Sequence, residues 1–138
     1  MAYTFTQTGA EIQAILDFVQ TKMETVLFSG DTTGTVTLSE SAANFSELVI
    51  YYEGASSRDP QTMTILNPNG RRIGLSIVED SASNGTRIRR ASYEISGTSI
   101  SLTTATGFSP GYTLLNGTAV SQSLGTNVIH ITKVVGRG

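Results

Sequence analysis

Histidine and cysteine, the residues that most often carry nucleophilic or metal chemistry, are scarce: the 138-residue sequence has one histidine and no cysteine. The absence of cysteine excludes disulfides, thiolate metal sites and cysteine nucleophiles. One histidine cannot supply the three or four nitrogen or sulfur ligands of a zinc site. His130 stands between two isoleucines and no G-x-S-x-G motif accompanies it, so we interpret it as a strand histidine rather than a catalytic base.

Pairs of carboxyl groups are the next candidates, because two acids about 5–9 Å apart can hydrolyse a glycosidic bond. The sequence has eleven acidic residues, but their spacing does not place any two in one cleft. Calcium binding by oxygen ligands at 30–34 or 78–85 stays an open alternative, but no EF-hand spacing supports it, and we interpret each segment as a solvated turn. We predict no cofactor and no enzymatic activity. The acids considered are Glu47, Glu53, Glu79, Asp80 and Glu94.

Arginines form the densest charge cluster, with three of the nine basic residues in four positions and two more one predicted hairpin earlier. If the two strands pair across a turn near Asn84, these side chains could converge and bind phosphate or carboxylate groups of a polymer. The alternative is that they protect an edge strand or contact acids on neighbouring strands. The five arginines are Arg71, Arg72, Arg87, Arg89 and Arg90.

Tyrosine rings can stack on sugars, and the sequence has five tyrosines and no tryptophan. Tyr52 shares the alternation of Leu48 and Ile50, which places it in the core. Tyr51 and Tyr112 are therefore the surface candidates for saccharide binding.

The elements that position these residues begin with a predicted helix at about 9–23, within an N-terminal segment 1–24. Thr8 and Glu11 have the spacing of a capping box. One face of the helix is apolar. Because a helix of about 15 residues is marginal alone in water, this face must be buried by something else. The apolar residues are Ile12, Ile15, Leu16, Val19 and Met23.

From Thr25 onward the periodicity changes to the alternation of strands. Eight to nine short strands, separated by turn signals every 8–12 residues or so, predict an antiparallel β-sandwich or jelly roll over 25–138. Strands do not alternate with helices, so a parallel sheet is not expected.

The last predicted strand is apolar on both faces, with Val128 and Val134 on one and Ile129, Ile131 and Val135 on the other. A strand that is apolar on both faces is covered on both, and we expect the second cover to be another subunit. Isoleucine at both a and d positions of a heptad favours trimers. The alternative is that the helix folds back over its own sandwich. The residues predicted to mediate assembly are Ile12, Ile15, Leu16, Val19, Met23, Val128 and Val134.

Charged residues are 14% of the chain and the net charge is −2, which gives no general attraction to nucleic acid or acidic membranes. No window approaches the roughly 18 apolar residues of a membrane span. The N-terminal residues show neither the basic start nor the apolar run of a signal peptide. We expect synthesis in a bacterial cytoplasm, with no nucleic-acid partner and no membrane insertion.

The order of a short helix and a Ser/Thr/Gly-rich β-domain resembles the distal modules of tail fibres and baseplate receptor-binding proteins of tailed bacteriophages. The segments TGAEIQAILDFV, VLFSGDTTGTVTLSESAANFSELVIYYEG and VIHITKVVGRG are similar to a recurrent layout in phage structural proteins of Gram-positive hosts. Because full-length fibres have a shaft and an attachment region, the resemblance implies a distal module or a small accessory protein.

What the resemblance implies is a virion protein whose homotrimeric head binds a host cell-surface saccharide, such as teichoic acid or capsule. The alternative is a purely structural virion component, such as a capsid decoration, head fibre or baseplate protein, whose partners are other virion proteins. A third hypothesis, a small polysaccharide depolymerase, requires a carboxylate pair that the sequence does not locate.

Overall fold

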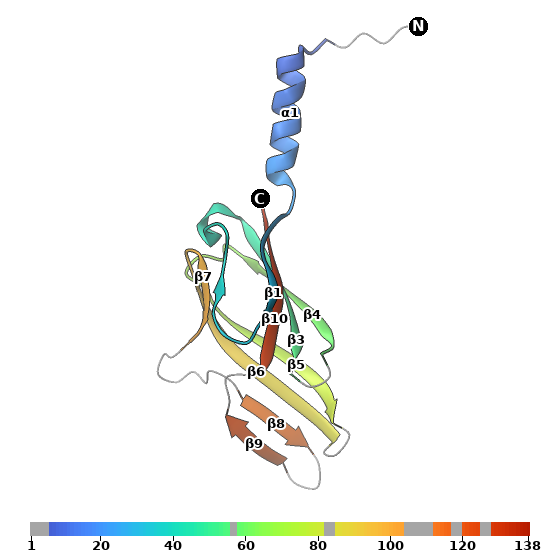
Figure 1. The fold of residues 1–138 in the computed structure, drawn as a ribbon, viewed down its shortest axis with the longest axis vertical. Helices are drawn as coiled ribbons and strands as arrows, with labels where there is room; N and C mark the ends of the chain where they lie inside the picture. The colour runs from blue at the N-terminus through green and yellow to red at the C-terminus, as the bar shows by residue number, and fades with distance from the viewer. Residues whose placement is uncertain (1–5, 56–57, 82–84, 104–111, 117–119, 125–127) are drawn as a thin grey trace, which may run out of the picture.

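The computed structural model describes residues 6–55, 58–81, 85–103, 112–116, 120–124 and 128–138. In these residues one α-helix precedes ten strands that form two antiparallel sheets (Figure 1). The prediction of a mainly β, antiparallel sandwich after a short helix is confirmed. The elements are α1 (Gly9–Lys22), β1 (Thr25–Thr32), β2 (Val36–Thr37), the 3-10 helix η1 (Ala42–Asn44), β3 (Glu47–Gly54), β4 (Pro60–Leu66), β5 (Arg72–Ser81), β6 (Gly85–Ser96), β7 (Ser99–Leu102), β8 (Tyr112–Asn116), β9 (Val120–Leu124) and β10 (Ile129–Arg137).

Helix α1 begins where the capping residues predict. The backbone N–H of Glu11 donates to Thr8 Oγ1 at 3.2 Å, which satisfies one of the N–H groups left over in the first turn. On the polar side, Gln13 Nε2 donates to Asp17 Oδ1 one turn further on, at 2.8 Å. Figure 1 shows the helix extending away from one end of the sandwich. The alternative that it folds back over its own sandwich is therefore wrong.

The first sheet has the strand order β1-β10-β3-β4, and the second has the order β2-β7-β6-β8-β9 with β5 on the other side of β6. Glycine turns connect some of these strands. Gly97 has φ +57 in the two-residue turn that joins β6 to β7, and Gly70 has φ +78 in the turn before β5. Both values lie in the left-handed region that favours glycine. In Figure 1 the β8–β9 hairpin lies at the end of the molecule opposite α1.

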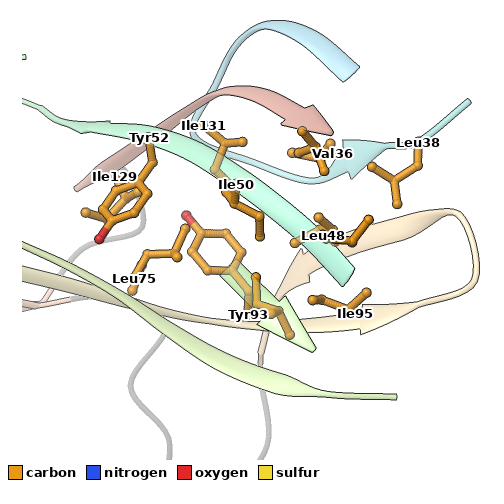
Figure 2. Packing of buried hydrophobic residues seen from close by; sticks show 14 of the residues in the cluster. Val36, Leu38, Leu48, Ile50, Tyr52, Leu75, Tyr93, Ile95, Ile129 and Ile131 are labelled. Carbon is orange, nitrogen blue, oxygen red and sulfur yellow. The ribbon is translucent and has the colours of Figure 1, made fainter. Parts of the chain in front are cut away.

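The core lies between the two sheets and follows the predicted alternation, with Leu48, Ile50 and Tyr52 of β3 buried (Figure 2). Tyr52 also joins the sheets, because its Oη donates to the carbonyl oxygen of Ser76 on β5 at 2.9 Å. Burial raises the pKa of Tyr52. Other buried members are Leu27, Val36, Leu38, Leu75, Ile77, Ala91, Ile95, Ile100, Ile129 and Ile131.

Strand β10 corrects one prediction. A register shift between Ile131 and Lys133 inserts an extra residue opposite β3, so Val134 lies on the core side together with Ile129 and Ile131. Val128 and Val134 are 5% and 0% exposed within the single chain. They need no second subunit to cover them, and their assignment to an assembly surface is wrong.

Tyr93 of β6 provides the first testable prediction. Its side chain is fully buried among aliphatic residues (Figure 2), and its Oη has no hydrogen-bond partner among the described residues. Burial raises the pKa of this phenol. Because an unsatisfied buried hydroxyl costs about 1–3 kcal/mol, we expect Tyr93→Phe to raise the free energy of unfolding by roughly 1 kcal/mol in urea denaturation. A loss of stability would show that the hydroxyl is bonded.

Candidate functional site

Helix α1 carries the largest group of exposed apolar side chains in the described part of the chain. Five residues of the predicted stripe are between 39% and 61% exposed, and Phe18 is 62% exposed. A 14-residue helix is about 21 Å long, so the stripe runs over nearly its whole length. The stripe residues are Ile12, Ile15, Leu16, Val19 and Met23.

The angular width of this stripe indicates how many neighbouring helices α1 could contact. Ile15 and Leu16 flank the line of Ile12, Val19 and Met23 and widen the apolar arc to about 100°. A two-stranded coiled coil needs only a narrow a/d seam. Phe18 extends the arc further. The sequence reasoning omitted it, although its position three residues after Ile15 was a usable signal.

An ion-pair junction of Arg137 with Glu24 and Glu47 lies where the chain passes from α1 into β1. Arg137 near the end of β10 donates through Nε to Glu24 Oε1 at 2.8 Å, and its Nη2 contacts the same oxygen. Its Nη1 donates to Glu47 Oε1 at 3.3 Å. These bonds, first to Glu24 and then to Glu47, raise the pKa of Arg137. The junction therefore fixes the residue that precedes β1 against the last residue of β10.

The predicted arginine patch is not formed by the described side chains. The β5–β6 register places Arg72 opposite Glu94 and Arg87 opposite Glu79, so the two arginines lie near opposite ends of the hairpin. Arg71 Nε donates to the carbonyl oxygen of Asn67 at 3.2 Å. The five arginines do not form one patch, because the register separates Arg72 from Arg87 along the hairpin and Arg89 lies on the inner face with Glu79. The side chain of Arg87 lies outside the description.

Arg89 and Arg90 point to opposite faces of β6, as neighbours in a strand do. Arg89 Nε donates to Glu79 Oε2 at 2.8 Å, and the two side chains are 12% and 0% exposed. Arg90 is exposed and its guanidinium lies against Gly74, where a Cβ would collide with it. The alternative interpretation, contact with an acid on the neighbouring strand, is confirmed for Arg89.

Glu79 is buried at the interface of the two sheets, beneath the end of β3. A Cβ at Gly54 would collide with its carboxylate, so glycine leaves the space that the Glu79 side chain occupies. Other acids considered for catalysis also contact cations: Glu47 contacts Arg137, and Glu53 contacts Arg58. The side chain of Asp80 lies outside the description. These contacts give each of the three acids a structural role.

The two candidate tyrosines lie on strands of different sheets. Tyr51 of β3 is half-buried on the side away from the core, with Lys133 Nζ 5.4 Å from its ring centroid. Tyr112 begins β8, opposite Arg90 of β6 and Leu124 of β9. The description does not extend to the Tyr112 side chain.

A cluster of four titratable side chains that the sequence did not predict lies at one end of the first sheet. Arg58 joins three of them: its Nη2 donates to Asp31 Oδ2 at 2.7 Å, and its Nε donates to Glu53 Oε2 at 2.6 Å. His130 Nδ1 is 2.6 Å from Asp31 Oδ1 and 2.9 Å from Arg58 Nη1. Arg58 has φ +60, a left-handed conformation that is unfavourable for a residue with a side chain. Its pKa is raised by the bonds to Asp31 and Glu53.

Asp31 gives a second testable prediction. The hydrogen bond from Arg58, followed by that from His130, holds the pKa of Asp31 below its ordinary 3.8. A carboxylate whose pKa is lowered by folding stabilises the protein above the ordinary value, and this stabilisation is lost as the pH falls through the lowered pKa. We therefore expect Asp31→Asn to melt slightly below the wild type at neutral pH, with the difference vanishing in acid. Thermal melts from about pH 7 to about pH 2 test this, and an unchanged difference in acid would contradict it.

Two hollows of the described surface are lined by residues other than the predicted ligand-binding ones. One, of about 270 Å³, lies between η1 and the turn before β5; the other, of about 290 Å³, lies beside β5 and β4. Among the described residues, His, Asp and Glu side chains do not gather in any group of three or more that could hold a metal ion. Within the same part of the chain, no helix has the length and apolar character needed to cross a membrane.

Comparisons with known proteins do not identify relatives. No model of a known protein family matches the chain, and no curated protein matches its sequence. The exposed face of α1 is therefore the candidate functional site on the strength of its own geometry.

Proposed function

We propose that this protein is a self-assembling structural module of a bacteriophage virion. In this module three α1 helices pack in parallel around a common axis, and three β-sandwich heads cluster at one end. The observation that carries the proposal is the apolar face of α1, which stands clear of the sandwich with its side chains 39–62% exposed. An isolated helix of 14 residues is marginal in water, so association is what would stabilise it.

Three helices fit this face better than two. The apolar arc of about 100° is wider than the a/d seam of a two-stranded coiled coil. β-Branched Ile12, Ile15 and Val19 at core positions favour trimers over dimers. The head does not compete for this face, because the core between its sheets is closed within one chain.

Two features support the assignment to a virion. One is the order of the elements, and the other is the resemblance of the sequence segments to those of phage structural proteins. A short helix followed by a cysteine-free sandwich is the layout that resembles phage tail-fibre and baseplate proteins. Mass spectrometry of phage particles released from cells that carry this gene tests the assignment. Detection in the particle fraction supports it, and restriction to the cytosolic fraction contradicts it.

Cysteine scanning tests the assembly, because the natural chain has no cysteine. In a parallel bundle, Val19→Cys places thiols of two chains next to each other at the axis, so mild oxidation should give a covalent dimer that persists on dilution. Gln13→Cys, on the polar side of the same helix, is the matched control and should give little cross-linking. Equal cross-linking of the two variants would contradict the proposed packing.

The head is the part of the module that we assign to binding a host-surface saccharide. Among the described candidates, Tyr51 supports this role, because its half-buried ring and the ammonium group of Lys133 lie together on the outer side of the first sheet. We expect binding on an array of host-envelope glycans to be lost in Tyr51→Ala. Absence of wild-type binding to any host envelope fraction would favour the alternative, a purely structural virion component.

A further inference from the structure

His130 Nδ1 has two neighbours that it cannot satisfy at the same time. Arg58 Nη1, 2.9 Å away, is a donor and needs the nitrogen lone pair. Asp31 Oδ1, 2.6 Å away, is an acceptor and needs a proton on that same nitrogen. The protonation state of the imidazole therefore decides which of the two contacts is a hydrogen bond.

The charged groups around this ring come from three elements besides β10. Asp31 lies on β1, Glu53 lies on β3 directly opposite His130, and Arg58 lies between β3 and β4. Arg58 also bonds Asp31 Oδ2 and Glu53 Oε2, so its guanidinium bridges the ends of β1 and β3. Lys133, the next cation along β10, lies over Tyr51 instead.

We propose that the protonation state of His130 sets how firmly Arg58 is held against the first sheet. When the imidazole is neutral, Nδ1 accepts a hydrogen bond from Arg58 Nη1. Arg58 then has a third bonding partner besides Asp31 and Glu53. When the imidazole takes up a proton, Nδ1–H donates to Asp31 Oδ1. The imidazolium then repels the guanidinium and competes with it for Asp31.

The backbone of Arg58 makes its position responsive to such a change. A residue with a side chain at φ +60 is held there by its surroundings, and the described contacts that hold Arg58 are its bonds to Asp31, Glu53 and His130. Loss of the bond to His130 in acid should loosen Arg58 while leaving the sheets paired. The cluster lies at the start of β10, whereas α1 precedes β1 at the other end of this strand pair, where Thr25 lies opposite Gly136. Protonation of His130 should therefore act without dissolving any assembly through α1.

Nitrogen-15 NMR of the His130 ring in the full-length protein tests the proposal directly, at about pH 8 and about pH 5, which bracket the range where histidine changes charge. We expect Nε2 to carry the proton at the higher pH, with Nδ1 unprotonated, and both nitrogens to be protonated at the lower pH. Protonated Nδ1 with a free Nε2 lone pair at the higher pH would overturn the proposal. It would mean a fixed bond to Asp31 in both states.

The anchoring of Arg58 is the second readout. Corrected for intrinsic pH dependence, protection of the Arg58 Nε–H from exchange should fall about two- to fivefold between the higher and the lower pH, the range expected for one exposed charged contact. His130→Gln cannot titrate and should show constant protection. An equal fall in His130→Gln would assign the effect to another group and overturn the proposal.

Discussion

Val19→Lys is expected to convert the assembled protein into a folded monomer. Val19 lies near the centre of the apolar arc of α1 and is 49% exposed in the single chain. In a parallel trimer the substitution places three ammonium groups at the axis, where they repel one another and lose hydration. Each helix also loses about half of the roughly 1.5–3 kcal/mol that full burial of a valine-sized side chain gives, because Val19 is already half-buried in the single chain. Light scattering should show the mass fall to that of one chain.

Gln13→Lys is the matched control for this experiment. It places the same residue on the polar side of the same helix, four positions before Asp17, where a lysine and an aspartate attract each other. We expect the mass of the assembly to be unchanged. Circular dichroism should show the β-signal of the head unchanged in both variants, because α1 lies apart from the core. If both lysine variants keep the wild-type mass, α1 is not the assembly surface.

Arg89→Met is expected to lower the free energy of unfolding by up to about 3–5 kcal/mol, because it removes an ion-pair partner of a buried carboxylate. Glu79 is 1% exposed and Arg89 Nε bonds it at 2.8 Å. Arg90→Met is the matched control. The neighbouring side chain is exposed on the other face of β6, so its replacement should cost less than about 1 kcal/mol. Urea denaturation measures both values.

A double variant separates the ion pair from other roles of Arg89. Replacing both partners of a buried pair with apolar residues is often nearly neutral, so Glu79→Leu should recover much of the stability lost in Arg89→Met. The sequence alone suggested a different role, in which Arg89 is one of five arginines that bind phosphate or carboxylate groups of a polymer. If Arg89→Met has wild-type stability but abolishes binding to host-envelope glycans, that hypothesis stands and the structural role is wrong.

Local signals predicted the fold well. Thr8 and Glu11 located the beginning of α1, and the alternation around Ile50 identified the core face of β3. These features depend on residues close in the sequence. Strand β2 has two residues, too few to show a periodicity. The extra residue between Ile131 and Lys133 reversed the expected side of Val134, because a one-residue insertion moves later side chains to the other face.

The sites were harder to predict because their members are far apart in the sequence. Asp31 and His130 are separated by 99 positions, and Glu24 and Arg137 by 113. Their contacts depend on the strand order β1-β10-β3, which the sequence did not determine. The arginine patch failed for a related reason. The sequence indicated that Arg72 and Arg89 lie on neighbouring strands. Only the register shows that they occupy different places on the hairpin.

The mass of the full-length wild-type protein in solution, measured by light scattering over a range of concentrations, tests the central claim most directly. Three parallel α1 helices predict a particle of three times the 14.6 kDa of one chain. A particle of 14.6 kDa at every concentration would contradict the account, because α1 would then keep its apolar face in water without a partner.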